Sequence, residues 1–261
     1  MKNAFSLATA ILLCCGSASA GTITDNGATG YWGSDGHGFG DIIGDSSFDV
    51  KSANVAKSGT TLKIQIVTNF AGHAGVDTWA TPKGIGYGDV FLASAWNPFG
   101  ADAHHTGDGA ANGTVWSYGL NLDNRWSNTG GTFKLYSLDG AANSSNIVNS
   151  ESFMSCAIGT ACYYRNGQAT AVKTDSSTVH YTGLTGTWSV NPNNSLSFAI
   201  DLKGTALAAY DMMALHWGET CQNDVIEGFT KVPEPASIAL FAAGLLGLGL
   251  RRRTRTSGQT R

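Results

Sequence analysis

The sequence has little positive charge outside its C-terminal end. Residues 21–230 contain nine Lys and Arg residues against 18 Asp and Glu residues, a formal charge of −9, and five of the seven Arg residues fall within the last eleven positions. A protein that binds nucleic acid needs a basic surface to neutralise phosphates. The shortage of basic residues therefore argues against a nucleic acid as the partner of residues 21–230.

Cysteine is also sparse, with five residues in the whole chain and three of them after residue 21. No C-x-x-C pair occurs, which removes support for a zinc site or a thioredoxin-type redox site. Cys156 and Cys162 flank a short stretch and are the natural disulfide pair in an exported chain. Cys221 is then left over, and three cysteines alone do not determine the connectivity.

Motifs of hydrolases and nucleotide-binding enzymes are absent as well. The sequence contains no G-x-S-x-G, no H-E-x-x-H and no P-loop. A glycosidase needs two carboxyl groups at a defined separation, and 18 acidic residues offer no means of selecting a pair. We therefore expect no catalytic activity. The alternative is a secreted hydrolase of polysaccharide or peptide, which needs a concave pocket with a perturbed carboxylate or histidine.

Alternating apolar and polar residues, typical of half-buried β-strands, recur along the chain. In residues 61–70, TLKIQIVTNF, one face collects Leu62, Ile64 and Ile66. Residues 195–202 repeat the pattern, and Asn166-Gly167 predicts a hairpin turn between two strand-like segments. No long stretch with a helical period precedes the C-terminal end. The pattern predicts one all-β domain, an antiparallel β-sandwich or jelly roll, over residues 21–230.

Longer apolar runs occur at the two ends of the chain. Residues 1–20 have a positive start, an apolar core and a small-residue cleavage site before Gly21, as a signal peptide does. Residues 236–250 carry no charge and as a helix would span about 22 Å of a hydrocarbon core about 30 Å thick. Three basic residues follow this segment, namely Arg251, Arg252 and Arg253. They are the positive-inside signal of a single C-terminal transmembrane helix, which would leave residues 257–261 in the cytoplasm.

A short extended motif precedes this apolar segment, made of Pro233, Glu234 and Pro235. The order of Pro-Glu-Pro, apolar helix and Arg cluster over residues 231–256 resembles the PEP-CTERM sorting signal of Gram-negative bacteria. The resemblance implies an exosortase, a membrane cysteine protease, as the partner that processes the chain at the inner membrane. It implies delivery to the cell surface or to the exopolysaccharide matrix of a biofilm. The alternative is a tail that stays as a permanent anchor.

Aspartate makes up 15 of the 18 acidic residues in residues 21–230. Calcium prefers hard oxygen ligands, and glycine lets the backbone curl so that several oxygens meet one cation. Two acidic stretches lie near opposite ends of the domain and would meet if its first and last strands pair. We therefore expect a calcium site from Asp35, Asp41, Asp45, Asp224 and Glu227. The alternative is that these residues only form turns with solvated carboxylates.

Two tryptophans lie in a loop-rich region, residues 69–112, namely Trp79 and Trp96. Exposed aromatic faces stack on flat, partly apolar ligands such as sugar rings, although both side chains could instead pack under the loops. Together these features predict a non-catalytic structural or binding module outside the cytoplasm. We expect it to bind carbohydrate, exopolysaccharide above all, and to be stabilised by calcium.

Overall fold

The computed structural model describes most of the domain between the two apolar ends of the chain. The described residues are 20–25, 30–31, 41–44, 46–100, 108–109, 111–155 and 164–232. Several residues predicted to act in sorting, in a disulfide or in calcium binding lie outside them: Pro233, Glu234, Pro235, Arg251, Arg252, Arg253, Cys156, Cys162, Asp35 and Asp45. Among the described residues, no helix has the length and apolar character needed to cross a membrane.

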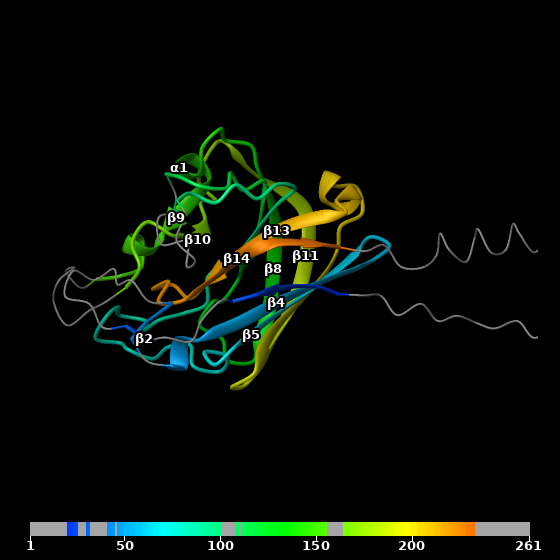
Figure 1. The fold of residues 1–261 in the computed structure, drawn as a ribbon. Helices are drawn as coiled ribbons and strands as arrows, with labels where there is room; N and C mark the ends of the chain where they lie inside the picture. Colours follow the sequence, from blue (N-terminus) through cyan, green and yellow to red (C-terminus); the bar gives the residue numbers. More distant parts are fainter. Residues whose placement is uncertain are drawn as a thin grey trace, which may run out of the picture.

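One ten-stranded sheet dominates the described chain (Figure 1), and all its neighbouring strands run antiparallel. Its order is β1 (Gly21–Thr24), β4 (Val50–Ser58), β5 (Thr61–Thr68), β12 (Ser195–Asp201), β11 (Val179–Asn191), β8 (Gly130–Leu138), β7 (Tyr118–Leu122), β6 (Val90–Ala93), β13 (Met212–Gly218) and β14 (Val225–Lys231). The prediction of an all-β, antiparallel domain is thus confirmed.

Several short strands and helical turns lie outside this sheet. β2 (Gly30–Tyr31) and β3 (Ile42–Ile43) form a short parallel pair, and β9 (Ile147–Asn149) pairs antiparallel with β10 (Ala169–Val172). The helical elements are single turns: η1 (Ser46–Phe48), α1 (Asn143–Asn146), η2 (Ser150–Ser152) and η3 (Ala206–Ala209).

The sheet curls until its two edges meet, so the structure is one nearly closed sheet where the sequence predicted a β-sandwich or jelly roll. The hydrogen-bonded order begins at β1 and ends at β14, yet these strands lie in contact. A side chain at Gly21 would collide with Thr230 and Lys231. Register shifts in the β4–β5 and β8–β11 pairs are bulge-like irregularities, which increase the twist and bend of a sheet. One bent sheet therefore encloses the core that two layers would have enclosed.

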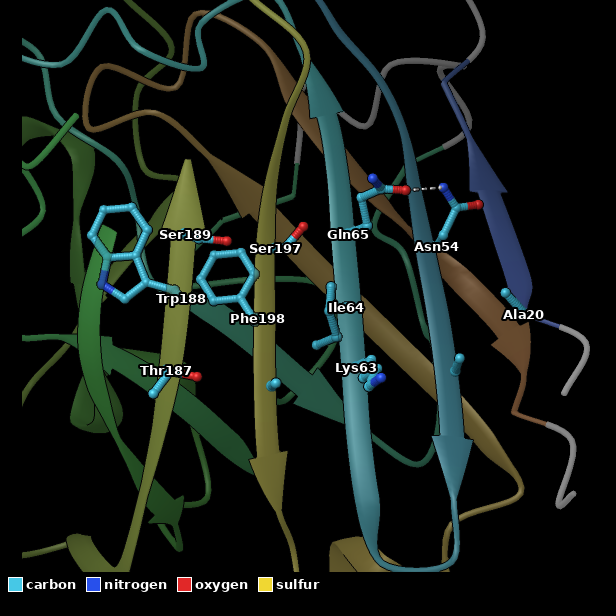
Figure 2. A pocket seen from close by; sticks show the side chains of 12 residues that line it. Ala20, Asn54, Lys63, Ile64, Gln65, Thr187, Trp188, Ser189, Ser197 and Phe198 are labelled. Atoms are coloured by element: carbon cyan, nitrogen blue, oxygen red, sulfur yellow. Dashed lines mark hydrogen bonds between the residues drawn. The ribbon is translucent and has the colours of Figure 1, made fainter. Parts of the chain in front are cut away.

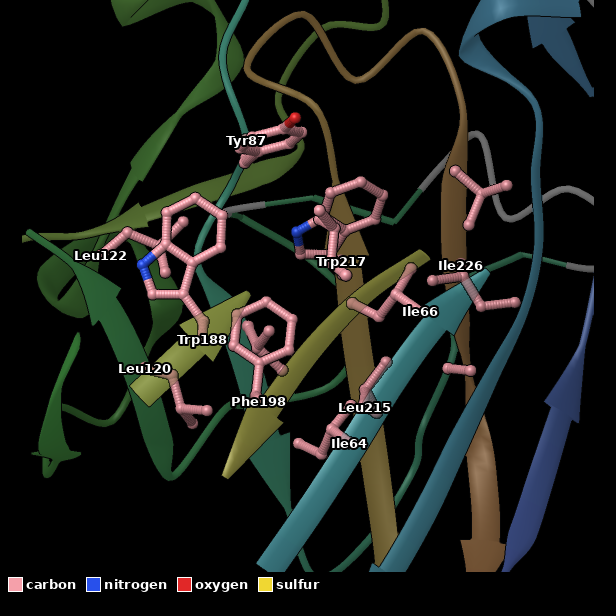
Figure 3. Packing of buried hydrophobic residues seen from close by; sticks show 14 of the residues in the cluster. Ile64, Ile66, Tyr87, Leu120, Leu122, Trp188, Phe198, Leu215, Trp217 and Ile226 are labelled. Carbon is pink, nitrogen blue, oxygen red and sulfur yellow. The ribbon is translucent and has the colours of Figure 1, made fainter. Parts of the chain in front are cut away.

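The core fills the inside of the curled sheet, and alternate residues of the strands point into it, as the period-two pattern predicts. Ile64 and Ile66 are buried, whereas Lys63 and Gln65 between them are exposed. Large aromatic rings fill the centre (Figure 3), where Trp188 lies 5.5 Å from Tyr87 and 6.3 Å from Phe198 between ring centroids. Burying each such side chain stabilises the fold by roughly 1.5–3 kcal/mol.

A second, smaller core lies on the outer face of the sheet. There β9, β10 and the residues around α1 cover part of β6, β7 and β13, and the buried apolar residues include Phe91, Trp116, Val172 and Ala214. Successive residues of a strand point to opposite faces. For that reason His216 faces this outer core, while Trp217 faces the inner one.

Candidate metal centre and surface groove

Three aspartates meet where the edges of the sheet come together. Asp25 directly follows β1, Asp41 directly precedes β3, and Asp224 directly precedes β14. Each offers one carboxylate oxygen, and these three oxygens lie within 4.8 Å of one another. We call Asp25, Asp41 and Asp224 the aspartate cluster. Asp41 and Asp224 belong to the set predicted for calcium, whereas Asp25 was not selected from the sequence.

Backbone contacts hold the aspartate cluster in place. Asp224 accepts hydrogen bonds from the backbone N–H of Val50 and of Val225, each at 2.7 Å, and so ties the starts of β4 and β14 together. The backbone N–H of Ile43 donates to the Asn223 carbonyl at 2.7 Å, which joins β3 to the loop before β14. Arg165 donates from Nη2 to the Asp41 carbonyl at 2.6 Å. The loops that carry the carboxylates are therefore anchored to one another.

The electrostatics of this region are dominated by buried acids. Burial raises the pKa of Asp224 well above its ordinary value, and the charges of Asp25, Glu219 and Asp41 raise it further. Burial likewise raises the pKa of Glu219 to about 8, although backbone N–H groups, that of Asp224 among them, partly oppose the shift. The same burial raises the pKa of the free Cys221 thiol, with the Glu219 charge adding to it. Burial is therefore the main cause of all three shifts.

Glu227, also predicted as a calcium ligand, lies in the outer core instead. Its Oε2 is 2.9 Å from Nδ1 of His216, and its Oε1 accepts a hydrogen bond from Nε1 of Trp96 at 2.8 Å. The other ring nitrogen of His216 lies 2.8 Å from the Ala169 carbonyl. Each ring nitrogen of His216 thus faces an oxygen atom, which fixes the orientation of the imidazole. Burial raises the pKa of Glu227, but the hydrogen bond and charge of His216, with Asp108 and Trp96, hold it below the ordinary 4.5.

The two tryptophans predicted to stack on a ligand differ in exposure. Trp79 is 62% exposed, in the loop that follows β5, and its Nε1 donates to Asp77 at 3.0 Å. Trp96 is partly buried against the outer core and bonded to Glu227. Trp79 is therefore the more exposed of the two predicted stacking residues.

A groove with a volume of about 480 Å³ runs over the outer face of β4, β5, β12 and β11 (Figure 2), and both apolar and polar residues line it. The strand register places one polar side chain from each strand in a single row: Asn54, Gln65, Ser197 and Ser189. A neighbouring row consists of Ala56, Lys63, Ala199 and Thr187. With strands about 4.8 Å apart, each row is about 14 Å long. Period-two alternation predicts these side chains to be outward, but nothing in the sequence reveals that four strands align them.

The comparison with family models locates a PEP-CTERM protein-sorting motif at residues 231–253. The chain carries a PEP-CTERM motif. The motif begins at Lys231, the last residue of β14, and includes the buried Val232, whose N–H donates to the Asp211 carbonyl at 2.8 Å. It indicates an exported protein that is anchored transiently in the membrane before an exosortase processes it. No curated protein and no solved structure matches the chain.

Proposed function

We propose that this PEP-CTERM protein is a non-catalytic module of the cell surface or exopolysaccharide matrix, which binds polysaccharide and is stabilised by calcium. The sorting motif supports the destination. The observation that carries the binding function is the row of Asn54, Gln65, Ser197 and Ser189 across four strands. Such a row presents hydrogen-bond donors and acceptors at regular spacing, as a chain of sugar hydroxyls does.

Hydrogen bonds between side chains fix the orientation of the amides in this row. Thr22 donates to Oδ1 of Asn54 at 2.8 Å, and Gln65 donates to Oγ of Ser195 at 3.3 Å. A longer contact, 3.5 Å, joins Nδ2 of Asn54 to Oε1 of Gln65. Because these groups are already oriented, a ligand that binds them loses less side-chain entropy. The groove is thus suited to a polar, extended ligand.

The chemistry of the groove lining supports a binding role over a hydrolytic one. Asn, Gln, Lys, Ser and Thr supply its polar groups, and no Asp, Glu or His occurs among its described residues. Two carboxyl groups with shifted pKa values, Glu219 and Glu227, lie in the interior, since Glu219 is 0% exposed and Glu227 is bonded to His216. A general acid must reach its substrate to act. The described groove therefore lacks the groups that a glycosidase uses.

Glycan binding tests the proposal. The exported protein, purified in detergent with its tail retained, is applied to a glycan array and titrated with the glycans retained. Ser197→Arg places a long side chain in the groove and is expected to weaken binding at least about tenfold. Ser144→Arg, at an exposed position of α1, is the matched control and should bind as the wild type does.

Two outcomes contradict the proposal: no glycan retained by the wild-type protein, or equal affinity for the wild type and Ser197→Arg. Release of new reducing ends from a bound polysaccharide would favour the hydrolase alternative. Melting temperatures of both variants show whether the substitutions preserve the fold.

A further inference from the structure

We infer that Asp25, Asp41 and Asp224 bind a calcium ion that fastens the first strand of the sheet to the last. This inference rests on the calcium stabilisation in the proposed function, and it assigns the ligands and their mechanical role. Calcium holds its oxygen ligands at about 2.3–2.6 Å, so that two ligands on opposite sides of the ion lie about 5 Å apart. The three carboxylate oxygens, within 4.8 Å of one another, can therefore all reach one ion.

Three further buried oxygens, on Glu219 and Asn223, have no hydrogen-bond donor of normal geometry among the described residues. Glu219 is 0% exposed, and neither of its carboxylate oxygens accepts a hydrogen bond of normal geometry from the described residues. Its carboxyl group lies near the backbone N–H of Asp224. Asn223 is 5% exposed, and its Oδ1 likewise has no donor among the described residues. Buried oxygens without donors are costly, and a cation or the water molecules bound to it would satisfy them.

The charge balance points the same way. Around the aspartate cluster lie two more acids: Asp49, which pairs with the exposed Lys51 at 3.9 Å, and the buried Glu219. Arg165 is a buried cation that interacts with these acids: its charge lowers the pKa of Glu219, and its Nη2 donates a hydrogen bond to the Asp41 carbonyl. Buried charges of one sign need either protons or counter-charges. A calcium ion supplies two positive charges where the carboxylates converge, and the half-buried Asp25 leaves a route for the ion from solvent.

The position of the site in the fold indicates what the ion would do. The hydrogen-bonded order of the sheet stops at β1 and at β14, so side chains must hold these two edges together. Ile23 packs against Gly228 along the seam. At one end of the seam, Asp25 follows β1 and Asp224 precedes β14. An ion bound by both side chains would close the seam there and would stabilise β14, the strand that leads into the sorting motif.

Thermal unfolding of the exported protein, purified in detergent with its tail retained, tests the site. After treatment with EDTA, melting is followed by tryptophan fluorescence in EDTA, in calcium and in magnesium. Calcium sites of extracellular modules have Kd values of about 10⁻⁴–10⁻³ M. With a Kd of about 0.1 mM, calcium at about 10 mM should lower the unfolding equilibrium constant about 100-fold and raise the melting temperature. Magnesium should do less, because it demands octahedral geometry and retains its water.

Asp25→Asn separates a metal ligand from a merely structural aspartate. In EDTA this variant should be at least as stable as the wild type, because one like charge has left the aspartate cluster. In calcium it should gain little. A structural aspartate would instead lower stability equally in both buffers. Asp175→Asn, at an exposed position far along the chain, is the control and should keep the full response to calcium. Terbium luminescence reports binding without reference to unfolding.

The site is refuted if calcium leaves the wild-type melting temperature unchanged, or if Asp25→Asn keeps the wild-type response. Glycan titration of the same samples distinguishes this failure from failure of the proposed function. Glycan binding without a calcium response overturns the site alone. A calcium response without glycan binding overturns the polysaccharide-binding role and leaves the site standing.

Discussion

Replacing Asp89 by alanine should strongly destabilise the domain. Asp89 is 0% exposed and directly precedes β6. It accepts hydrogen bonds from four donors: Asn121 Nδ2 at 2.8 Å, the Leu122 N–H at 3.0 Å, Arg125 Nη2 at 3.0 Å and the Val172 N–H at 2.8 Å. One carboxylate thus connects β7, β10 and a buried arginine, and it holds β10 over the outer face of the sheet.

The magnitude follows from these partners. Removing one member of a buried ion pair costs about 3–5 kcal/mol, because the remaining charge is left uncompensated. A domain of this kind has a total stability of about 5–15 kcal/mol. For a domain of about 200 residues, each kcal/mol corresponds to about 2–4 °C. We therefore expect Asp89→Ala to lower the melting temperature by about 6–20 °C.

Urea and thermal unfolding of the exported protein measure this loss. Asp175→Ala, at an exposed position, should stay within about 0.5 kcal/mol of the wild type. Adding Arg125→Met to Asp89→Ala should recover part of the loss, because the unpaired charge is then removed. A loss below about 1 kcal/mol for Asp89→Ala would show that the carboxylate is not the hub that its four donors indicate.

Three further predictions concern pH, processing and packing. Because the folded pKa of Glu227 lies below 4.5, its contribution is present at neutral pH and is lost as the pH falls through that lowered value. Melting scans below pH 4.5 should show this loss, and Glu227→Gln should flatten it. Mass spectrometry of the mature protein should place its C-terminus after Val232, which is buried and bonded to Asp211; a C-terminus at or before Lys231 would contradict this. Gly186→Ala should cost about 1–3 kcal/mol in urea unfolding, because the new methyl group would collide with Phe133, and a neutral result would refute the close packing of that pair.

Individual strands followed from the sequence, but their arrangement did not. Residues 61–68 and 195–201 alternate clearly, and they became the neighbouring strands β5 and β12. Asn166-Gly167 does form a turn, with Gly167 at a φ of +72°. However, the strand after it, β10, pairs with β9 from earlier in the chain. Local turn chemistry specifies the bend but not the partner strand, which depends on the packing of the outer core.

For the candidate sites as well, the sequence predicted some individual residues but not how they are arranged in space. The idea that the first and last strands approach each other placed Asp41 near Asp224, but Asp25 stands alone in the sequence and gave no comparable signal. Glu227 lies between Ile226 and Gly228, which face the inside, and period two therefore directs it to the outer face. The alternation of residues along this strand therefore already predicts that Glu227 points outward. The alignment of four polar side chains in the groove depends on strand register, which no single segment encodes.

β14 runs from one end of the domain to the other, and different features lie at its two ends. At one end, Gly21 lies against Lys231, so the start of β1 and the start of the sorting motif lie side by side (Figure 1). At the other end, about 20 Å away over the seven residues of β14, lies the aspartate cluster. The aspartate cluster thus lies at the opposite end of the seam from Lys231, where the sorting motif begins.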